Sequence, residues 1–181
     1  MPRYAAFLRA VNLGANRRAG GADLRSCFEG AGFEDVATFR TSGNVVFDAR
    51  REAAAKLERR IEAALAKSLG FDVTVFVRTA SEIAALAEHE PFPPATVEAS
   101  KGKLQVALLS SKPGAKARKE VLALATDEDR LDLGERELYW LPSGATQQSG
   151  LDMKTIDRLL HPMTMRTKGT IEQLAARYFG D

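Results

Sequence analysis

The order of the periodic segments in the first 78 residues limits most strongly how this chain can fold. Segments with the alternating pattern of strands and segments with the spacing of helices follow one another as strand, helix, strand, strand, helix, strand. We expect the strands at residues 4–11, 36–40, 45–48 and 71–78, and the helices at about residues 24–31 and 52–69. This order is that of the split βαβ, or ferredoxin-like, arrangement, in which an antiparallel sheet carries both helices on one face.

The second half of the chain repeats much of this order after a short helix that begins near Thr79 and a proline-rich stretch. We expect a strand at 104–109, a helix at 115–125, a hairpin of 130–133 with 137–141, and helices at 151–160 and about 170–179. The sequence therefore predicts an α+β protein with two related β-α-β-β-α subdomains, built mainly of antiparallel sheets with helices packed on them. The expected boundaries are residues 1–92, a linker at 93–102, and residues 103–181.

Composition and charge exclude several classes of protein. One cysteine, Cys27, excludes an intramolecular disulfide framework, and His89 and His161 lie too far apart for a two-histidine metal site on one helix. The formal net charge of +2 is too small to indicate a dedicated nucleic-acid-binding protein. The chain has no apolar run of about 18 residues that would span a membrane, and its amino terminus lacks the apolar stretch of a secretory signal. We expect a globular, cytoplasmic protein without a membrane partner, a metal or a cofactor.

Three stretches within the first 48 residues resemble a known family. They read Phe-Leu-Arg-Ala-Val-Asn-Leu-Gly at 7–14, Ala-Asp-Leu-Arg at 22–25 and Thr-Ser-Gly-Asn-Val-Val-Phe at 41–47. The chain is similar here to the bacterial domain of unknown function 1697 family, whose members open with a strand reading Leu-Arg-Gly-Ile-Asn-Val-Gly and carry a hairpin reading Gln-Ser-Gly-Asn-Val-Val-Phe. The resemblance implies a bacterial α+β protein of two subdomains, in a family with no established activity, cofactor or catalytic residue.

The chain also departs from the pattern of that family. Ala10 stands where the family usually has a glycine, and the carboxy-terminal motif Thr-Thr-Arg-Asn-Trp appears here within Met-Thr-Met-Arg-Thr-Lys at 163–168. We expect any site that the family builds from these residues to be altered in this member.

The loop at residues 12–21 is the best candidate for a binding site. It joins a strand to the start of a helix, where unpaired N–H groups attract anions, and its glycines permit the backbone to turn those groups inward. Residues 1–25 carry five arginines and one aspartate. The candidate ligand-binding residues are Arg9, Asn12, Gly14, Arg17, Arg18, Ser42, Asn44 and Arg166. The same residue types also fit a surface loop at 12–21, a tight turn at 41–44 and a capped helix start after Arg166.

The topology bears on whether these residues form one site. In a β-α-β-β order we expect the loop at 12–21 and the turn at 41–44 to fall at opposite ends of the sheet, which counts against a shared site.

These observations favour a non-catalytic module that binds an anionic ligand, such as a nucleotide, a phosphate or RNA, through the loop rich in glycine and arginine. Two other functions stay open: a protein-interaction scaffold without a small ligand, and an enzyme that acts on a small phosphorylated substrate in a cleft between the subdomains. The enzyme is the least favoured because the sequence offers no evident nucleophile or base. Cys27 lies on the apolar face of its predicted helix, and no serine lies in a Gly-x-Ser-x-Gly motif.

Overall fold

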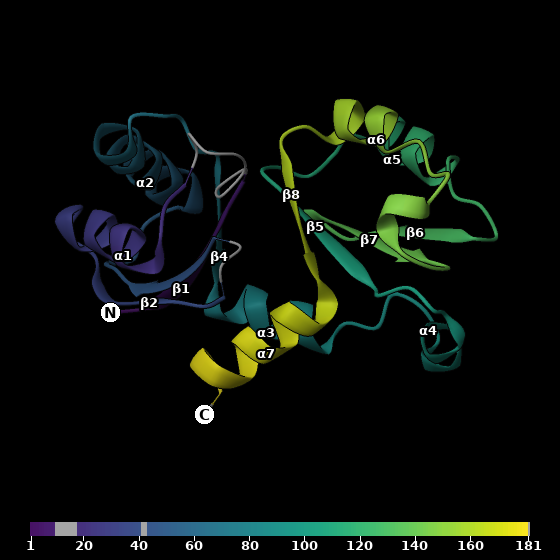
Figure 1. Cartoon of the computed structure of the whole chain (residues 1–181), viewed down its shortest axis with the longest axis horizontal. Helices are drawn as coiled ribbons and strands as arrows, with labels where there is room; N and C mark the ends of the chain where they lie inside the picture. Colours follow the sequence, from purple (N-terminus) through teal and green to yellow (C-terminus); the bar gives the residue numbers. More distant parts are fainter. Residues whose placement is uncertain (10–17, 41–42, 181) are drawn as a thin grey trace. The chain divides into compact units, whose positions relative to one another are not determined.

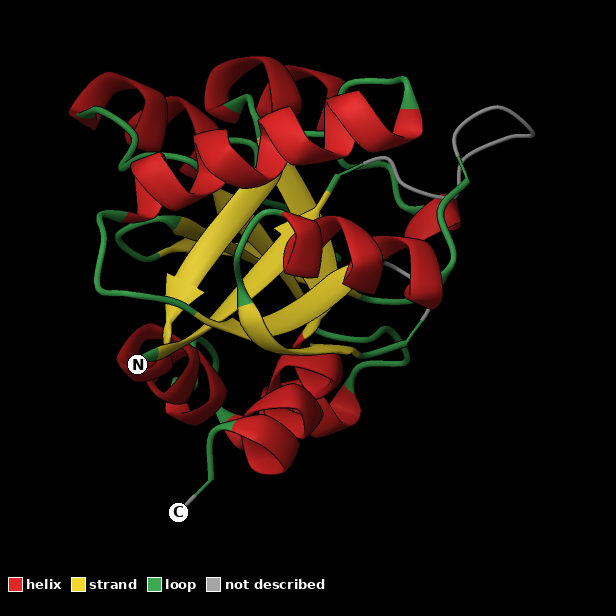
Figure 2. Ribbon diagram, turned by 90° about the vertical axis from the view of Figure 1, so that its left-hand side faces the viewer, coloured by secondary structure: helices red, strands yellow, loops and turns green. Residues whose placement is uncertain are grey.

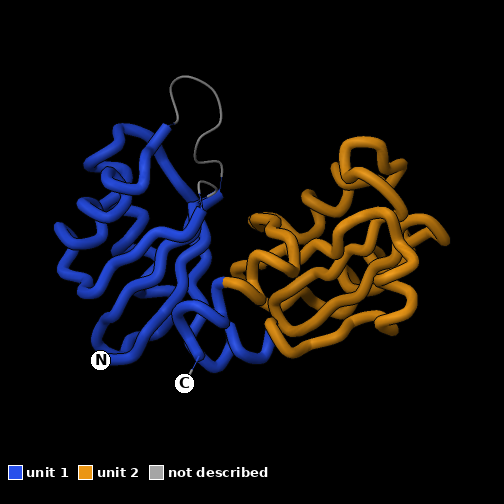
Figure 3. The backbone as a smooth tube through the Cα atoms, turned by 60° about the horizontal axis from the view of Figure 1, so that its bottom comes forward, with its two compact units in different colours: residues 1–86, 174–181 blue, residues 87–173 orange. Residues whose placement is uncertain are grey.

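The structure is a computed structural model that describes residues 1–9, 18–40 and 43–180 of the 181-residue chain. The chain forms two compact units, which Figure 3 shows in different colours. The first unit contains residues 1–86 and the C-terminal segment from Leu174, and the second contains residues 87–173. Each unit has its own four-stranded sheet. Within the described ranges, no helix is both long and apolar enough to cross a membrane.

The sheet of the first unit has the strand order β2-β3-β1-β4, and every neighbouring pair is antiparallel. Its elements are, in chain order, β1 (Arg3–Leu8), α1 (Gly21–Gly30), β2 (Glu34–Thr38), β3 (Asn44–Asp48), α2 (Ala54–Leu69) and β4 (Val75–Thr79). β1 lies inside the sheet, where Ala6 pairs with Val45 on one side and with Val77 on the other. The β-α-β-β-α-β order predicted for this part of the chain is confirmed.

One face of this sheet packs with α1 and α2 to form the core of the first unit (Figure 1). Alternate residues of β1, such as Ala6 and Leu8, reach this core because side chains two residues apart in a strand share a face. α2 contributes residues spaced by four, which share one face of a helix: Leu57, Ile61 and Leu65. Each of these three is at most 1% exposed, and Leu69, one step of four further along the same helix, is partly buried against this core.

β4 is an edge strand whose outward N–H groups are covered by side chains instead of by another strand. Three alternate amides each donate to a glutamate: Val75 to Glu62 (3.0 Å), Val77 to Glu58 (3.0 Å) and Thr79 to Glu82 (2.8 Å). Glu58 and Glu62 come from α2, so this helix both covers the face of the sheet and satisfies its edge. A row of unpaired N–H groups would offer a template to another chain, and the three carboxylates close it.

The second unit has the same topology, with the strand order β6-β7-β5-β8 and antiparallel neighbours. Its elements are β5 (Gln105–Leu109), α5 (Ala115–Leu122), β6 (Asp129–Leu133), β7 (Glu137–Pro142), the 3₁₀ turn η1 (Thr146–Gln148), α6 (Met153–Leu160) and β8 (Met163–Thr167). The periodicity does not predict β8, because Met-Thr-Met-Arg-Thr lacks the β-branched apolar residues of a typical buried strand. With β8 the second unit is β-α-β-β-α-β, one strand more than the predicted β-α-β-β-α.

Both units are therefore antiparallel sheets with helices packed on them, and the predicted α+β class is confirmed. Figure 2 shows the strands in yellow and the helices that cover them in red.

The remaining helices of the described chain are α3 (Ala80–Glu88), α4 (Pro94–Ala99) and α7 (Lys168–Tyr178). α3, the short helix expected near Thr79, begins with a capping box. Thr79 Oγ1 accepts a hydrogen bond from the Glu82 N–H (3.2 Å), and the Glu82 carboxylate accepts one from the Thr79 N–H. α4 lies within residues 93–102, the stretch expected as a linker, and starts with a proline at its first turn. The C-terminal end of α7 belongs to the first unit, where Tyr178 contacts Phe39 edge-on with 6.1 Å between ring centres.

Candidate functional site

Of the predicted binding loop at residues 12–21, the structure describes residues 18–21, and it also describes Arg9, which precedes the loop. Arg9 directly follows β1, and its backbone N–H donates to the Thr74 carbonyl just before β4 (2.9 Å). Arg18, which precedes α1, is exposed. Four of the eight predicted ligand-binding residues lie outside the described residues: Asn12, Gly14, Arg17 and Ser42.

The strand register places the described residues that flank this loop and those that flank the β2–β3 turn at the same end of the sheet. Asn44, the first residue of β3, pairs with Phe7, near the end of β1, and the Leu8 N–H donates to the Gly43 carbonyl at 2.8 Å. Arg9 therefore follows directly beside the turn. The expectation that loop and turn lie at opposite ends is wrong, because α1 returns the chain to the start of the sheet. β2 then runs in the same direction as β1 and ends where β1 ends.

The start of α1 lies at this end as well. Gly21, the first residue of α1, packs so closely against Thr38, the last residue of β2, that a Cβ atom on Gly21 would lie 2.9 Å from Thr38 Oγ1. One donor here is already bound, because the Gly20 N–H donates to Asp23 Oδ2 at 3.1 Å. The other N–H groups of the first turn have no acceptor within the helix. We call this region the loop end of the first sheet; among the described residues it comprises Arg9, Arg18, the first turn of α1, Arg40 and Asn44.

Asn44 has a structural role at the loop end. Its side chain is fully buried, and Nδ2 donates to the Phe39 carbonyl (2.9 Å), whose own N–H donates to the Asn44 carbonyl (2.9 Å). Asn44 thus joins the described residues on the two sides of the turn, a structural role that its residue type allows. Arg40, in the same turn, has a φ of +60° and holds its guanidinium 5.4 Å from the centre of the Phe39 ring. Arg40 is exposed and brings a positive charge to this end.

Arg166 belongs to the second unit, whereas the other described candidates belong to the first. It lies in β8, is 8% exposed, and its Nη1 donates to Thr164 Oγ1 and to the Met165 carbonyl, both at 2.9 Å. Burial lowers the pKa of the Arg166 guanidinium to about 10. Its neighbour at the start of α7, Lys168, donates from Nζ to the Ala87 carbonyl and to a carboxylate of the same helix, each at 2.9 Å. Arg166 is therefore a buried strand residue that shares no unit with Arg9 or Arg18.

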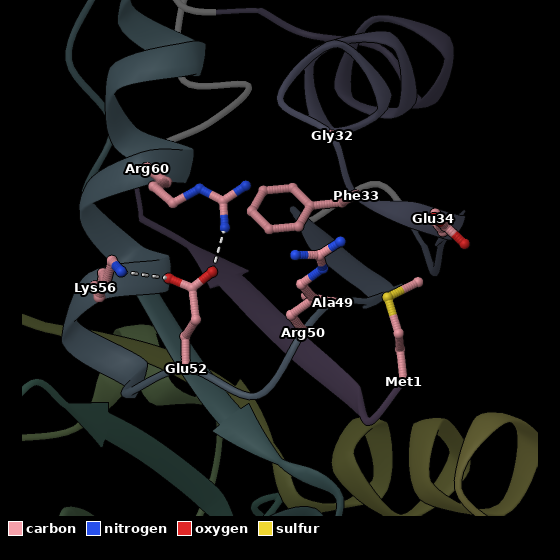
Figure 4. Close-up of a pocket in the computed structure, with 9 residues that line it drawn as sticks. All are labelled: Met1, Gly32, Phe33, Glu34, Ala49, Arg50, Glu52, Lys56 and Arg60. Atoms are coloured by element: carbon pink, nitrogen blue, oxygen red, sulfur yellow. Dashed lines mark hydrogen bonds and ion pairs between the residues drawn. The ribbon is translucent and has the colours of Figure 1, made fainter.

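A charged pocket in the first unit is missing from the sequence prediction (Figure 4). It has a volume of about 560 Å³ and lies between the α1–β2 connection, the segment after β3 and the first turns of α2. Its lining residues are Met1, Gly32, Phe33, Glu34, Ala49, Arg50, Glu52, Lys56 and Arg60. Three of them, Glu52, Lys56 and Arg60, are spaced by four residues. This spacing could have indicated the pocket from the sequence, but charged residues spaced by four are equally typical of a helix face that is exposed to solvent.

Glu52 joins two cations of α2 in this pocket, and Figure 4 shows its carboxylate between them. Oε1 accepts a hydrogen bond from Arg60 Nη1 (2.7 Å), and Lys56 Nζ lies 3.4 Å from Oε2. Arg60 also donates to a backbone carbonyl at the end of α1 (3.1 Å), and its guanidinium lies 4.6 Å from the centre of the Phe33 ring. Arg50, in contrast, is exposed and makes no hydrogen bond or ion pair with any residue that the structure describes.

The second unit holds a buried carboxylate in a different setting. Asp129, at the start of β6, accepts hydrogen bonds at Oδ1 from Trp140 Nε1 (2.9 Å) and from Ser149 Oγ (2.7 Å). Ser149 Oγ in turn accepts a hydrogen bond from the Leu151 N–H (3.0 Å). These contacts fasten the loop after β7 to the sheet, and they commit the Ser149 hydroxyl to that structural task. Across the residues described, no group of three or more His, Cys, Asp or Glu side chains is placed to hold a metal ion.

The fold defines a class of protein: two α+β units, each with a four-stranded antiparallel sheet of the same strand order. The chain belongs to the family described as a protein of unknown function (DUF1697), whose model matches residues 1–139. The family predicted from the motifs is thus confirmed.

The chain is similar to a structure described as the conserved bacterial protein SP0830 from Streptococcus pneumoniae, with 18% sequence identity, a TM-score of 0.71, and 97% of each chain covered. At this identity the similarity shows the fold, which spans both units. No curated protein matches the chain.

Proposed function

We propose that this chain is a non-catalytic binding protein for an anionic ligand, and that the loop end of the first sheet is its binding site. The supporting observation is the pairing of Phe7 with Asn44, which sets Arg9 beside the turn that carries Arg40. The start of α1 lies at the same end, as the close approach of Gly21 to β2 indicates. Two polar segments that are separate in the sequence thus meet at one end of one sheet.

The chemistry of the loop end suits phosphate groups. Guanidinium groups donate two parallel hydrogen bonds to phosphate oxygens, and arginines of this kind come from both segments: Arg9 and Arg18 from the first, and Arg40 from the turn. The N–H groups and the dipole at the start of α1 add a further attraction for negative charge. The Asp23 carboxylate weakens this attraction in part, because it is itself negative and already accepts a hydrogen bond from the Gly20 N–H. We therefore infer a phosphate-bearing ligand, with a nucleotide as the first example to test and its phosphates bound by the arginines.

A thermal-shift experiment at low salt tests this proposal with phosphate, sulfate, nucleotides and short RNA as probes. A ligand that binds only the folded state raises the free energy of unfolding by about 2.7 kcal/mol at ~100 times its Kd, which shifts the melting temperature by several degrees. The double variant Arg9→Ala/Arg18→Ala should lose most of the shift. The charge-matched control Arg51→Ala/Arg59→Ala should keep it, because both side chains are exposed and lie outside the loop end.

Three results would contradict the proposal. A flat response over all probes would favour the protein-interaction scaffold instead. A shift that both double variants lose equally would reflect overall charge and not this site. A response to RNA alone, falling steeply with salt, would replace the nucleotide by a nucleic-acid backbone as the ligand.

A further inference from the structure

Glu52 carries an unsatisfied oxygen into the charged pocket of the first unit. Oε2 is buried and accepts no hydrogen bond from any residue within the described ranges. Lys56 Nζ lies 3.4 Å from it, near enough for an ion pair but not directed toward it as a donor. A buried acceptor without a donor costs free energy comparable to that of a lost hydrogen bond. The pocket therefore favours a partner that brings a donor group to Glu52.

Cations that can receive an anion lie around the same carboxylate. The Arg50 guanidinium is exposed and unpaired within the described part of the chain. The Lys56 side chain is 65% exposed, and its contact among the described residues is the ion pair with Glu52. Arg60 differs, because a carboxylate, a backbone carbonyl and an aromatic ring fix its guanidinium. Arg60 thus orients Glu52, while Arg50 and Lys56 are available to a ligand.

We propose that this pocket binds a small phosphorylated molecule that carries hydroxyl groups, of the size and chemistry of a sugar phosphate. The phosphate binds Arg50 and the ammonium group of Lys56, whose flexible side chain turns from Glu52 toward it. That turn uncovers Glu52 Oε2, which accepts a hydrogen bond from a ligand hydroxyl. A pocket of about 560 Å³ accommodates a ligand of this size. The site is distinct from the loop end and does not depend on it.

Isothermal titration of the unmodified protein tests the hydroxyl requirement without any substitution. Ribose 5-phosphate should bind at least about 10-fold more tightly than n-butyl phosphate, which has a similar length but no hydroxyl. A hydrogen bond to a charged acceptor contributes enough for that ratio, since tenfold corresponds to about 1.4 kcal/mol. Equal Kd values for the two compounds would overturn the role of Glu52. Glycine is a zwitterion whose ammonium group also donates hydrogen bonds. If glycine binds more tightly than ribose 5-phosphate, the proposal that the ligand carries a phosphate is refuted.

Two variants and a control then locate the site. Arg50→Ala should raise the Kd for ribose 5-phosphate about 5-fold or more, as expected for loss of a charge-assisted hydrogen bond. Arg51→Ala removes the same charge one residue away, outside the pocket lining, and should leave the Kd unchanged. Glu52→Gln should reduce the preference for ribose 5-phosphate over n-butyl phosphate, because a neutral amide oxygen is a weaker acceptor than a carboxylate, and it should not weaken the binding of n-butyl phosphate. Equal effects of Arg50→Ala and Arg51→Ala would refute the site, whatever the outcome at the loop end.

Discussion

Replacing Asp129 by alanine tests how the second unit holds the loop after β7. Asp129 and Trp140 are each 4% exposed, and the carboxylate accepts hydrogen bonds from the Trp140 indole and the Ser149 hydroxyl. Without the carboxylate the indole N–H stays buried with no acceptor, which costs about 1–3 kcal/mol. Loss of the Ser149 contact adds about 1 kcal/mol. We therefore expect Asp129→Ala to lower the free energy of unfolding of the second unit by about 2–4 kcal/mol.

The assay uses the indole itself as the reporter. Trp140 is the only tryptophan of the chain, so its fluorescence during urea unfolding follows the second unit directly. Asp129→Asn keeps an acceptor oxygen for the indole and should cost less than the alanine variant. Asp132→Ala is the matched control on the same strand, because the Asp132 side chain makes no hydrogen bond or ion pair with the described residues. If Asp129→Ala unfolds within ~0.5 kcal/mol of that control, the carboxylate does not hold the loop as argued.

Other substitutions test the sheet edge, a close approach and a helix cap. Glu62→Ala should remove the acceptor of the Val75 N–H, lower stability by about 1–2 kcal/mol and speed amide exchange at Val75, whereas Glu62→Gln should restore most of the loss. Gly102→Ala should destabilise the second unit far more than Gly144→Ala, and thermal unfolding compares the two variants. A Cβ atom at position 102 would collide with two backbone carbonyl oxygens, one of them at 2.6 Å, whereas a Cβ atom at position 144 would meet open space. Hydrogen bonds from the first turn of α6 hold the pKa of Asp152 below its ordinary 3.8. Its contribution to stability is therefore present above pH 3.8 and lost as the pH falls through the lowered value, and an NMR titration of α6 should show this loss, absent in Asp152→Asn.

The fold was predictable wherever local pattern and burial agree. The stripe of Leu57, Ile61 and Leu65 and the capping box at Thr79 are local signals, and both are present in the structure. β8 lacked such a signal, because its five residues carry threonines and an arginine where a strand usually has apolar residues. It is a strand because β5 pairs with it, which is a tertiary cause that a single stretch of sequence does not reveal.

The candidate sites likewise combine residues that the sequence shows locally with an arrangement that only the tertiary structure sets. Arginine-rich segments are visible in the sequence, but the meeting of Arg9 with the β2–β3 turn depends on strand direction and register. The charged pocket depends on contacts from distant segments: Arg60 reaches the carbonyl of Ala31, 29 residues earlier. The spacing of the charged residues of α2 predicts a shared helix face but not what lies opposite it. Asn44 shows the reverse case, since the side-chain amide that suggested a ligand contact is buried and donates to the Phe39 carbonyl.

The most direct test of anion binding at the loop end is a ¹H–¹⁵N NMR titration with adenosine monophosphate at low salt. The proposal predicts saturable shifts centred on the amides of Arg9, Gly21 and Asn44, and their loss in the Arg9→Ala/Arg18→Ala variant. Shifts near Arg50 would report the second pocket separately. An absence of saturable shifts at the loop end, or identical shifts there in the double variant, would contradict the account.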